Sequence, residues 1–236
     1  MINKRILLID IETTTIVEYV EELNINLLRQ FQKIYEKNID KYKSMQEAFQ
    51  NEAPFHPEFS QVICVSVGYI NGNDTKITNF NIREDSEKLV LIKLRELFNK
   101  AIEKDYYLCG NNIKGFDIPF LGKRYLINNL IPPQHFPNYD TKPWDLKIID
   151  IKDIWTFGKF GSLFNTDLIC SSMNIPTPKD NMNGSMVYEK FYNKEIEEII
   201  NYCNKDVACA SGIGRPRPKP ARWRRVMRMV RAYLVA

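Results

Sequence analysis

Two carboxylates stand two residues apart in the stretch "ILLIDIETTT", residues 6–15, directly after four apolar residues. If this stretch is a strand, side chains at positions i and i+2 point to one face, so Asp10 and Glu12 lie side by side. Such a pair repels itself unless a cation, a shared proton or open water relieves the repulsion. The spacing therefore predicts either a cation site or an exposed strand end.

Two further aspartates stand on elements expected later in the chain. Asp117 comes near the start of a helix expected from "FDIPFL", and Asp206 lies on a helix expected over 195–208. Each has a structural explanation, since Asp117 suits a helix cap and Asp206 suits a solvated acidic face. Asp206 nevertheless borders the apolar stripe of its helix, with Tyr202 one turn before it on the same side. A carboxylate and a phenol at such a border are well placed to face a cleft.

The residue types limit which metal ion these carboxylates suit. Oxygen ligands alone favour Mg²⁺ or Mn²⁺, whereas zinc usually recruits histidine or cysteine. The chain has two histidines, His56 and His135, that form no ligand-spaced cluster, and its five cysteines include no C-x-x-C pair. Neither a zinc site nor a disulfide framework is expected, and the cysteines are expected to be reduced thiols.

Composition indicates a soluble globular protein, with 44% hydrophobic and 26% charged residues among 236. No apolar stretch approaches the roughly 20 residues of a membrane span, and the first residues lack a signal peptide, so a cytoplasmic location is expected. Eight of the 33 basic residues follow residue 214, which leaves 25 bases against 29 acids in the rest of the chain. Any nucleic-acid binding must therefore be argued from a site rather than from overall charge.

The first half of the chain is expected to form a three-stranded antiparallel meander with a helical insertion. Residues 4–12 form a short, nearly continuous apolar run, typical of a central strand. Residues 16–52 are charged and periodic without Gly or Pro, which predicts helices. The alternating runs 61–70 and 75–82 predict two strands, joined by a hairpin turn at Asn71-Gly72.

The second half alternates between helical and strand patterns. An amphipathic helix is expected over 84–104, a strand over 106–110, the helix from "FDIPFL", and a strand over 147–151 after a Pro-rich loop. A short helix at 184–193 and the helix at 195–208 follow. Together the two halves predict an α/β fold with a mixed β-sheet flanked by helices.

Three short motifs resemble those of a known family, the 3'-5' exonucleases with four acidic metal ligands on a ribonuclease H-like fold, the DEDD superfamily. The second motif has the form used by family B DNA polymerases. The three are "DIET" at Asp10 and Glu12, "NIKGFDIPFL" at Asn112, Phe116 and Asp117, and "YCNKD" at Tyr202 and Asp206. One subclass of the family places a histidine where this chain has Asn201, so the resemblance is to the tyrosine subclass.

More narrowly, the chain resembles stand-alone bacterial exonucleases similar to the proofreading domain of family B polymerases. The segments "HPEFSQVICVSVGY" and "SLFNTDLICSSMNIPTPKDNMNGSMVYEKFY" are also similar to them. The likeness extends from about residue 4 to 207, which predicts an exonuclease domain over 1–207 that contains the insertion 16–52.

The resemblance implies two divalent cations, Mg²⁺ or Mn²⁺, held by the four acids. It implies that Asp10 bridges both ions, that Glu12 and Asp206 mainly serve the ion that activates water, and that Asp117 holds the other through water. Tyr202 would orient the attacking water, because a phenol with an ordinary pKa near about 10 is a poor base at neutral pH.

Three residues are expected to contact substrate. By the resemblance, Phe116 stacks on a terminal base and Asn112 hydrogen-bonds near the scissile nucleotide, while Thr13 contacts the 3' end. The structural alternatives are a core aromatic for Phe116 and a turn-forming side chain for Asn112.

These observations predict a metal-dependent 3'-5' exonuclease that releases nucleoside monophosphates from single-stranded or frayed DNA 3' ends by a two-metal-ion mechanism. A role in DNA repair, and association with a polymerase or a repair complex, are compatible with that activity, and no membrane partner is expected. Two alternatives stay open: an RNA-trimming exonuclease, and a catalytically silent nucleic-acid-binding module on the same fold.

The tail, residues 208–236, differs in composition from the rest because arginine replaces lysine as the main base. One interpretation is a basic amphipathic helix for nucleic acid or a membrane surface, with apolar Trp223, Val226, Met227 and Val230. The change of composition favours the other, a non-native or disordered tail. If the family's last helix is cut short after Val207, Asp206 is expected to be poorly supported.

Overall fold

A five-stranded mixed sheet forms the centre of the protein. The computed structural model describes residues 5–71, 74–83, 85–134, 136–138, 140–157, 159, 166–172 and 182–211. The strands are β1 (Arg5–Thr15), β2 (Ser60–Asn71), β3 (Asp74–Asn81), β4 (Tyr106–Gly110) and β5 (Ile148–Asp150). Their order across the sheet is β3-β2-β1-β4-β5. β1 pairs antiparallel with β2 and parallel with β4, so it is the central strand.

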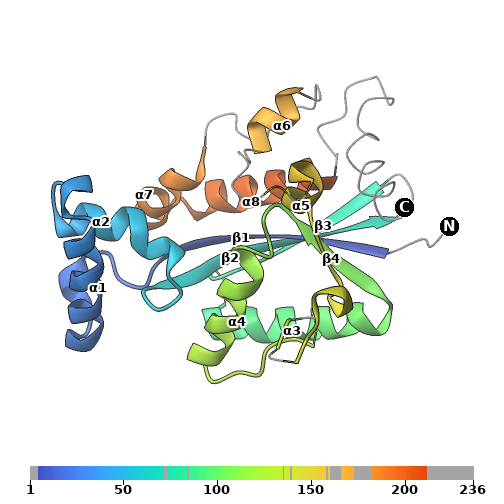
Figure 1. The fold of residues 1–236 in the computed structure, drawn as a ribbon, viewed down its shortest axis with the longest axis horizontal. Helices are drawn as coiled ribbons and strands as arrows, with labels where there is room; N and C mark the ends of the chain where they lie inside the picture. Colours follow the sequence, from blue (N-terminus) through green and yellow to red (C-terminus); the bar gives the residue numbers. More distant parts are fainter. Residues whose placement is uncertain are drawn as a thin grey trace.

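Helices cover both faces of this sheet (Figure 1). One face carries α3 (Glu87–Glu103) and α4 (Asp117–Ile127), and the other carries α5 (Ile151–Thr156), α7 (Val187–Tyr192) and α8 (Ile196–Ser211). A further helix, α6, spans Thr166–Ser172. The predicted α/β fold with a mixed sheet flanked by helices is confirmed. Within the described residues, no helix is both long enough and apolar enough to cross a membrane.

Alternation along β1 decides which of its side chains meet which layer. Leu7, Ile9 and Ile11 pack with α3 and α4, whereas Ile6 and Leu8 pack with α5 and α8. A strand buried on both faces reads as a continuous apolar run, which is why the sequence predicts a central strand here. If this alternation continues along β1, the next even-numbered residues, Asp10 and Glu12, face the same layer as α8.

β1 is longer than the sequence predicts. The expected strand stops at residue 12, but pairing with β2 continues through Thr15, which lies opposite Ser60. The β-branched threonines favour extended backbone, and a bulge between Glu12 and Thr13 adjusts the register. The two acids therefore lie within the strand, and an exposed strand end does not explain their spacing.

The helical insertion after the first strand consists of α1 (Ile25–Lys37) and α2 (Met45–Glu52), at one end of the sheet (Figure 1). It has its own apolar centre, in which the ring of Phe31 meets those of Phe49 and Phe59 edge to face, with centroids 5.0 and 5.3 Å away. The predicted hairpin falls between Asn71 and Asp74, which pair, while residues 72–73 lie outside the described part.

β4 parts from β1 at Gly110. The last β1–β4 pair is Leu8 with Cys109. A Cβ atom on Gly110 would lie 2.4 Å from the carbonyl oxygen of Ile9 and 2.5 Å from the Cγ2 atom of Ile113. Only a residue without a side chain lets the chain turn out of the sheet this close to β1.

α8 continues past the point where the sequence suggests that it is cut short. It reaches Ser211, and Val207, Cys209 and Ala210 are buried against the rest of the fold. The condition under which Asp206 was expected to be poorly supported is therefore not met, because Val207 lies inside α8. Residues 212–236, including the predicted basic helix, lie outside the described residues.

Gly110→Ala is expected to destabilise the protein by about 1 to 3 kcal/mol or more, because the added methyl meets backbone and a packed side chain. The matched control is Gly122→Ala inside α4, where the new Cβ would meet the ring of Phe136 at an ordinary 3.7 Å. This control should gain up to about 1 kcal/mol from helix propensity. Urea unfolding measures both, and equal effects of the two substitutions would contradict the role of Gly110.

Candidate functional site

The two acids of β1 face the last helix. The Sγ atom of Cys203, on α8, donates to the Asp10 Oδ2 atom and to the Asp10 carbonyl oxygen, at 3.4 Å each. One ligand atom from each of Asp10, Glu12 and Cys203 lies within 4.8 Å of the other two. Asp206 lies one turn further along α8. The strand and the helix thus bring three of the four predicted acids to one side of the sheet.

Asp117 reaches the same place from the opposite layer. Its Oδ1 atom accepts a hydrogen bond from the backbone N–H of Ile11 at 3.2 Å. β1 has no strand partner on this edge at Ile11, because β4 has already left, so the carboxylate takes the place of a paired strand. The N-cap of α4 is Phe116, and Asp117 is the first helical residue, so the capping explanation for Asp117 is wrong.

Burial and mutual repulsion raise the pKa values of these acids. The pKa of Asp10 is well above its ordinary value because of burial, and then because of the negative charges of Asp206 and Asp117. Burial also raises the pKa of Glu12, with Asp10 as the next cause. The pKa of Asp117 rises to about 7, again through burial first, although two backbone hydrogen bonds oppose the shift.

This arrangement fits divalent cations. Four carboxylates come from both layers of the fold to the place where β4 parts from β1, and the pKa shifts indicate that they disfavour one another's charged forms. All are hard oxygen ligands, which suit Mg²⁺ or Mn²⁺. A cation relieves the repulsion that otherwise keeps protons on these groups. Asp10, Glu12, Asp117 and Asp206 are therefore the residues that would hold metal.

Tyr202 lies beside these acids and keeps its proton. Its side chain is 7% exposed. Burial raises the pKa of Tyr202 far above its ordinary value, and the charges of Asp206, Glu12 and Asp10 and a hydrogen bond with Asp206 act in the same direction. The phenol is therefore a hydrogen-bond donor throughout the physiological range rather than a base.

Two buried cysteines border the carboxylates, and the sequence reasoning assigned them no part in the site. Cys203 is buried on α8, and its thiol contacts Asp10. Cys64 lies opposite Glu12 in the β1–β2 pairing. Burial raises the pKa of Cys203, and its hydrogen bond with Cys64 is the next cause. The thiol therefore stays protonated and donates to the carboxylate. The only signal in the sequence is the position of Cys203 next to Tyr202.

Asp150 is a third residue that the sequence reasoning missed. Its carboxylate accepts the backbone N–H groups of Asn112, Lys114 and Lys152, at 2.9 Å each, and is almost fully buried. These bonds fix the loop between β4 and α4, in which Asn112 has a left-handed backbone with φ 57°. Asp150 therefore positions the loop that leads to Asp117.

The three predicted substrate contacts occupy different surroundings. The side-chain oxygen of Asn112 already accepts a bond from the Lys152 Nζ atom at 3.0 Å, and the Thr13 hydroxyl donates to the Pro54 carbonyl at 2.8 Å. Phe116 is partly buried and contacts the core beneath α4. All three lie next to the proposed ligands in sequence or space, and their contact with substrate stays a prediction.

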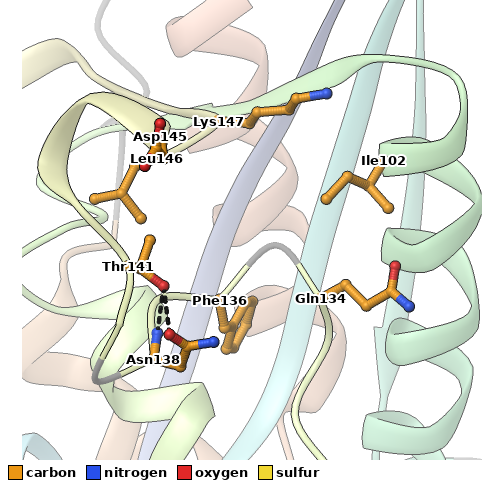
Figure 2. A pocket seen from close by; sticks show the side chains of 8 residues that line it. All are labelled: Ile102, Gln134, Phe136, Asn138, Thr141, Asp145, Leu146 and Lys147. Atoms are coloured by element: carbon orange, nitrogen blue, oxygen red, sulfur yellow. Dashed lines mark hydrogen bonds between the residues drawn. The ribbon is translucent and has the colours of Figure 1, made fainter.

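A small cavity of about 110 Å³ lies elsewhere, between α3 and the connection before β5. It is lined by Ile102 and by residues of the segment 134–147, where Asn138 and Thr141 hydrogen-bond to each other (Figure 2). None of the candidate site residues lines it. Because Asn138 and Thr141 satisfy each other's hydrogen bonds, we attribute this cavity to imperfect packing of the connection against α3.

Without divalent metal, the protein is expected to lose stability as pH rises from about 4 to about 7. Asp117 has a pKa of about 7 when folded and an ordinary value of 3.8. Between these values the folded state keeps a proton that the unfolded state has released, so rising pH favours unfolding. Asp117→Asn, which retains an acceptor for Ile11, should flatten the decline. Melting temperatures in EDTA across this range measure it, and an unchanged slope in the variant would contradict the assignment.

Mg²⁺ or Mn²⁺ is expected to raise the melting temperature, and more at pH 8 than at pH 5, because cations compete with protons for the same oxygens. At one hundred times the dissociation constant the gain is about 2.7 kcal/mol. Asp10→Asn should lose most of this gain. Glu96→Gln, an exposed site on α3, should keep it. An equal gain in all three proteins would refute a metal site at Asp10.

Comparison with known proteins identifies the family and the fold. The family described as predicted 3'-5' exonucleases related to the exonuclease domain of PolB matches residues 53–210, a range that excludes Asp10 and Glu12. The family B DNA polymerase from the hyperthermophilic archaeon Pyrobaculum calidifontis has a similar fold, with TM-score 0.55 and 16% identity over 87% of this chain and 23% of the polymerase. No match is found among curated proteins. The chain belongs to the family of predicted 3'-5' exonucleases related to the exonuclease domain of PolB.

Proposed function

We propose that the protein is a divalent-metal-dependent 3'-5' exonuclease that hydrolyses DNA from the 3' end and releases nucleoside monophosphates. The observation that carries this proposal is the convergence of four carboxylates and one protonated phenol where β1 and β4 part. A silent binding module needs no such set of mutually repelling acids. The family to which the chain belongs supports the reaction class and its polarity.

Asp10, Glu12, Asp117 and Asp206 would hold two cations, as the mutual repulsion of these acids favours. When bound, divalent cations at such a site supply Lewis acidity, which lowers the pKa of an attacking water and stabilises a leaving 3'-oxygen. The negative charges of Asp206 and Asp117 both raise the pKa of Asp10, so Asp10 interacts with acids from both layers of the fold. That position suits a ligand shared by both ions.

The side chains of the protein orient the reactants. Tyr202 keeps its proton, so it would not accept the proton of the attacking water. Its single O–H bonds with Asp206 in the absence of metal, and with Asp206 engaged by a cation that O–H would be available to orient the water. Cys203 donates to Asp10 and so holds one carboxylate oxygen in place. The hydrogen bond from Ile11 to Asp117 does the same for the acid of the opposite layer.

DNA is the proposed substrate, as single strands or frayed ends. The similarity to a domain of a DNA polymerase supports DNA over RNA. An exonuclease of this kind would trim 3' ends in repair, or correct the product of a separate polymerase. The comparison that decides between substrates is degradation of DNA and RNA oligonucleotides of one sequence in parallel.

Wild-type protein is expected to shorten a 5'-labelled DNA oligonucleotide from its 3' end in Mg²⁺ or Mn²⁺, and to stop in EDTA. Asp10→Asn should lower the rate by about 100- to 1000-fold, because a carboxylate that would hold metal is lost. Glu96→Gln removes an equivalent carboxylate on α3, across the sheet from α8, and should retain full activity. Equal activity in Asp10→Asn would refute the mechanism, and degradation of RNA alone would refute the substrate.

Tyr202→Phe is expected to lower kcat by up to about 100-fold with little change in KM, because the water is less well aimed. The pH profile should keep its shape, since the phenol does not titrate in this range. Tyr35→Phe on α1 is the matched control and should have no effect. A profile that loses its alkaline or acidic limb in Tyr202→Phe would show that the phenol acts as an acid or base instead.

A further inference from the structure

The ring of Phe55 is exposed although buried residues precede and follow it in the same segment. Phe55 ends the short helix η3 (Ala53–Phe55) between α2 and β2, and 64% of its surface is exposed. Ala53, two residues before, is fully buried, and Phe59, four residues later, is 4% exposed. Single exposed apolar side chains are normal on protein surfaces, so the exposure of Phe55 carries weight only together with the contacts that its ring makes.

Two independent contacts place Phe55 beside the proposed catalytic centre. Its ring meets the ring of Phe116 edge to face, with centroids 5.9 Å apart and planes at 65°. Phe116 directly precedes the proposed ligand Asp117. Pro54, adjacent to Phe55, accepts the hydrogen bond of the Thr13 hydroxyl, and Thr13 directly follows the proposed ligand Glu12.

The backbone that carries Phe55 is held on both sides. The N–H of His56 donates to the Ala53 carbonyl at 2.9 Å, and the Ser60 hydroxyl donates to the His56 carbonyl at 2.6 Å. The Nη1 atom of Arg124, a buried residue of α4, donates to the carbonyl of Pro57 at 2.7 Å. The ring is therefore exposed on a fixed support, and little ordering is needed when something binds it.

The aromatic contact continues into the core. Phe116 meets Phe120, whose centroid is 5.3 Å away and whose side chain is 2% exposed. Phe120 anchors the row, Phe116 lies half-buried in the middle, and Phe55 forms its exposed end. Such a row presents a flat apolar ring at the edge of an acidic, cation-binding centre.

We propose that Phe55 is a substrate-binding residue that stacks on a nucleobase near the 3' end of the strand, as the outer part of a platform with Phe116. The inference rests on the proposed function. Base-aromatic stacking tolerates any sequence because each base has a π-face, which suits an enzyme that must bind whatever base is terminal. The helical insertion thereby contributes to substrate binding through the segment that closes it.

The test compares substitutions of Phe55 on single-stranded oligonucleotides. Phe55→Ala should raise KM about 5- to 100-fold while kcat stays nearly unchanged, because stacking is lost and the carboxylates remain. Phe55→Leu keeps an apolar side chain without a π-face and should also be impaired, whereas Phe55→Trp should restore binding. Trp144→Ala removes an aromatic ring that is 76% exposed at a distant surface, and it should change neither constant.

Oligonucleotides with a single abasic position locate the contact. If Phe55 stacks on one base near the 3' end, an abasic site at that position weakens binding to wild type, and Phe55→Ala then adds no further loss. Fluorescence anisotropy on the inactive Asp10→Asn background gives the same comparison without turnover. The inference would be overturned if the loss of affinity from Phe55→Ala were the same whichever position is abasic. It would also be overturned if KM and affinity were unchanged in Phe55→Ala.

The outcomes separate this inference from the proposed function. Active wild-type protein with an unaffected Phe55→Ala variant refutes the role of Phe55 and leaves the nuclease standing. Wild-type protein that binds oligonucleotides but hydrolyses none refutes the nuclease, while the anisotropy comparison still decides whether Phe55 stacks on a base. Because the side chain is exposed, Phe55→Leu and Phe55→Ala are expected to fold, and their melting temperatures verify this.

Discussion

Repulsion between carboxylates held out of water is the constraint on which the rest of the structure depends. Asp10 and Glu12 are adjacent on β1, and each is further disfavoured as an anion by Asp117 and Asp206. A chain selected only for stability would separate or replace such groups. The fold instead holds them together with donors that cannot neutralise them: a thiol, a phenol and a backbone amide. Divalent cations would relieve this repulsion.

Holding these groups requires rigid support, which the surrounding elements provide. Gly110 lets β4 turn away, and that exposes the β1 edge to which Asp117 binds. On the face of the sheet that α3 and α4 cover, a buried ion pair joins Arg124 of α4 to Glu87 of α3. The Oε1 atom of Glu87 also accepts a hydrogen bond from the backbone N–H of Val62 in β2, at 2.9 Å. Removing one partner of such a pair typically costs about 3 to 5 kcal/mol. The helix that carries Asp117 is therefore fixed relative to β2 and to the segment before it.

Local pattern predicts much of this fold, because its elements have clear periodicity. The alternating residues of β2, the apolar run of β1 and the apolar stripe of α8 each predict the type of element and the face that it buries. The end of β1 was less predictable, since the threonines after Glu12 extend only because β2 offers them partners. The extent of α8 was mispredicted for a related reason: composition changes near Val207, whereas burial of Ala210 continues the helix.

The candidate site was partly predictable, since three motifs contain its acids and its phenol. What the sequence does not contain is the contact between elements: Ile11 and Asp117 are 106 residues apart, and Asp10 and Cys203 are 193 apart. Asp150 was missed for the same reason. It looks like the ordinary cap of α5, and only the fold shows that it also binds two backbone amides of the loop before α4.

The distribution of the acids along the chain has a consequence for synthesis in the cell. The strand with Asp10 and Glu12 is made early, but the helix with Asp206 and Tyr202 is made almost 200 residues later, and it packs directly on that strand. A chain still attached to the ribosome holds an incomplete set of acids until α8 has emerged. Binding of metal by all four acids would therefore have to wait until α8 has packed on β1.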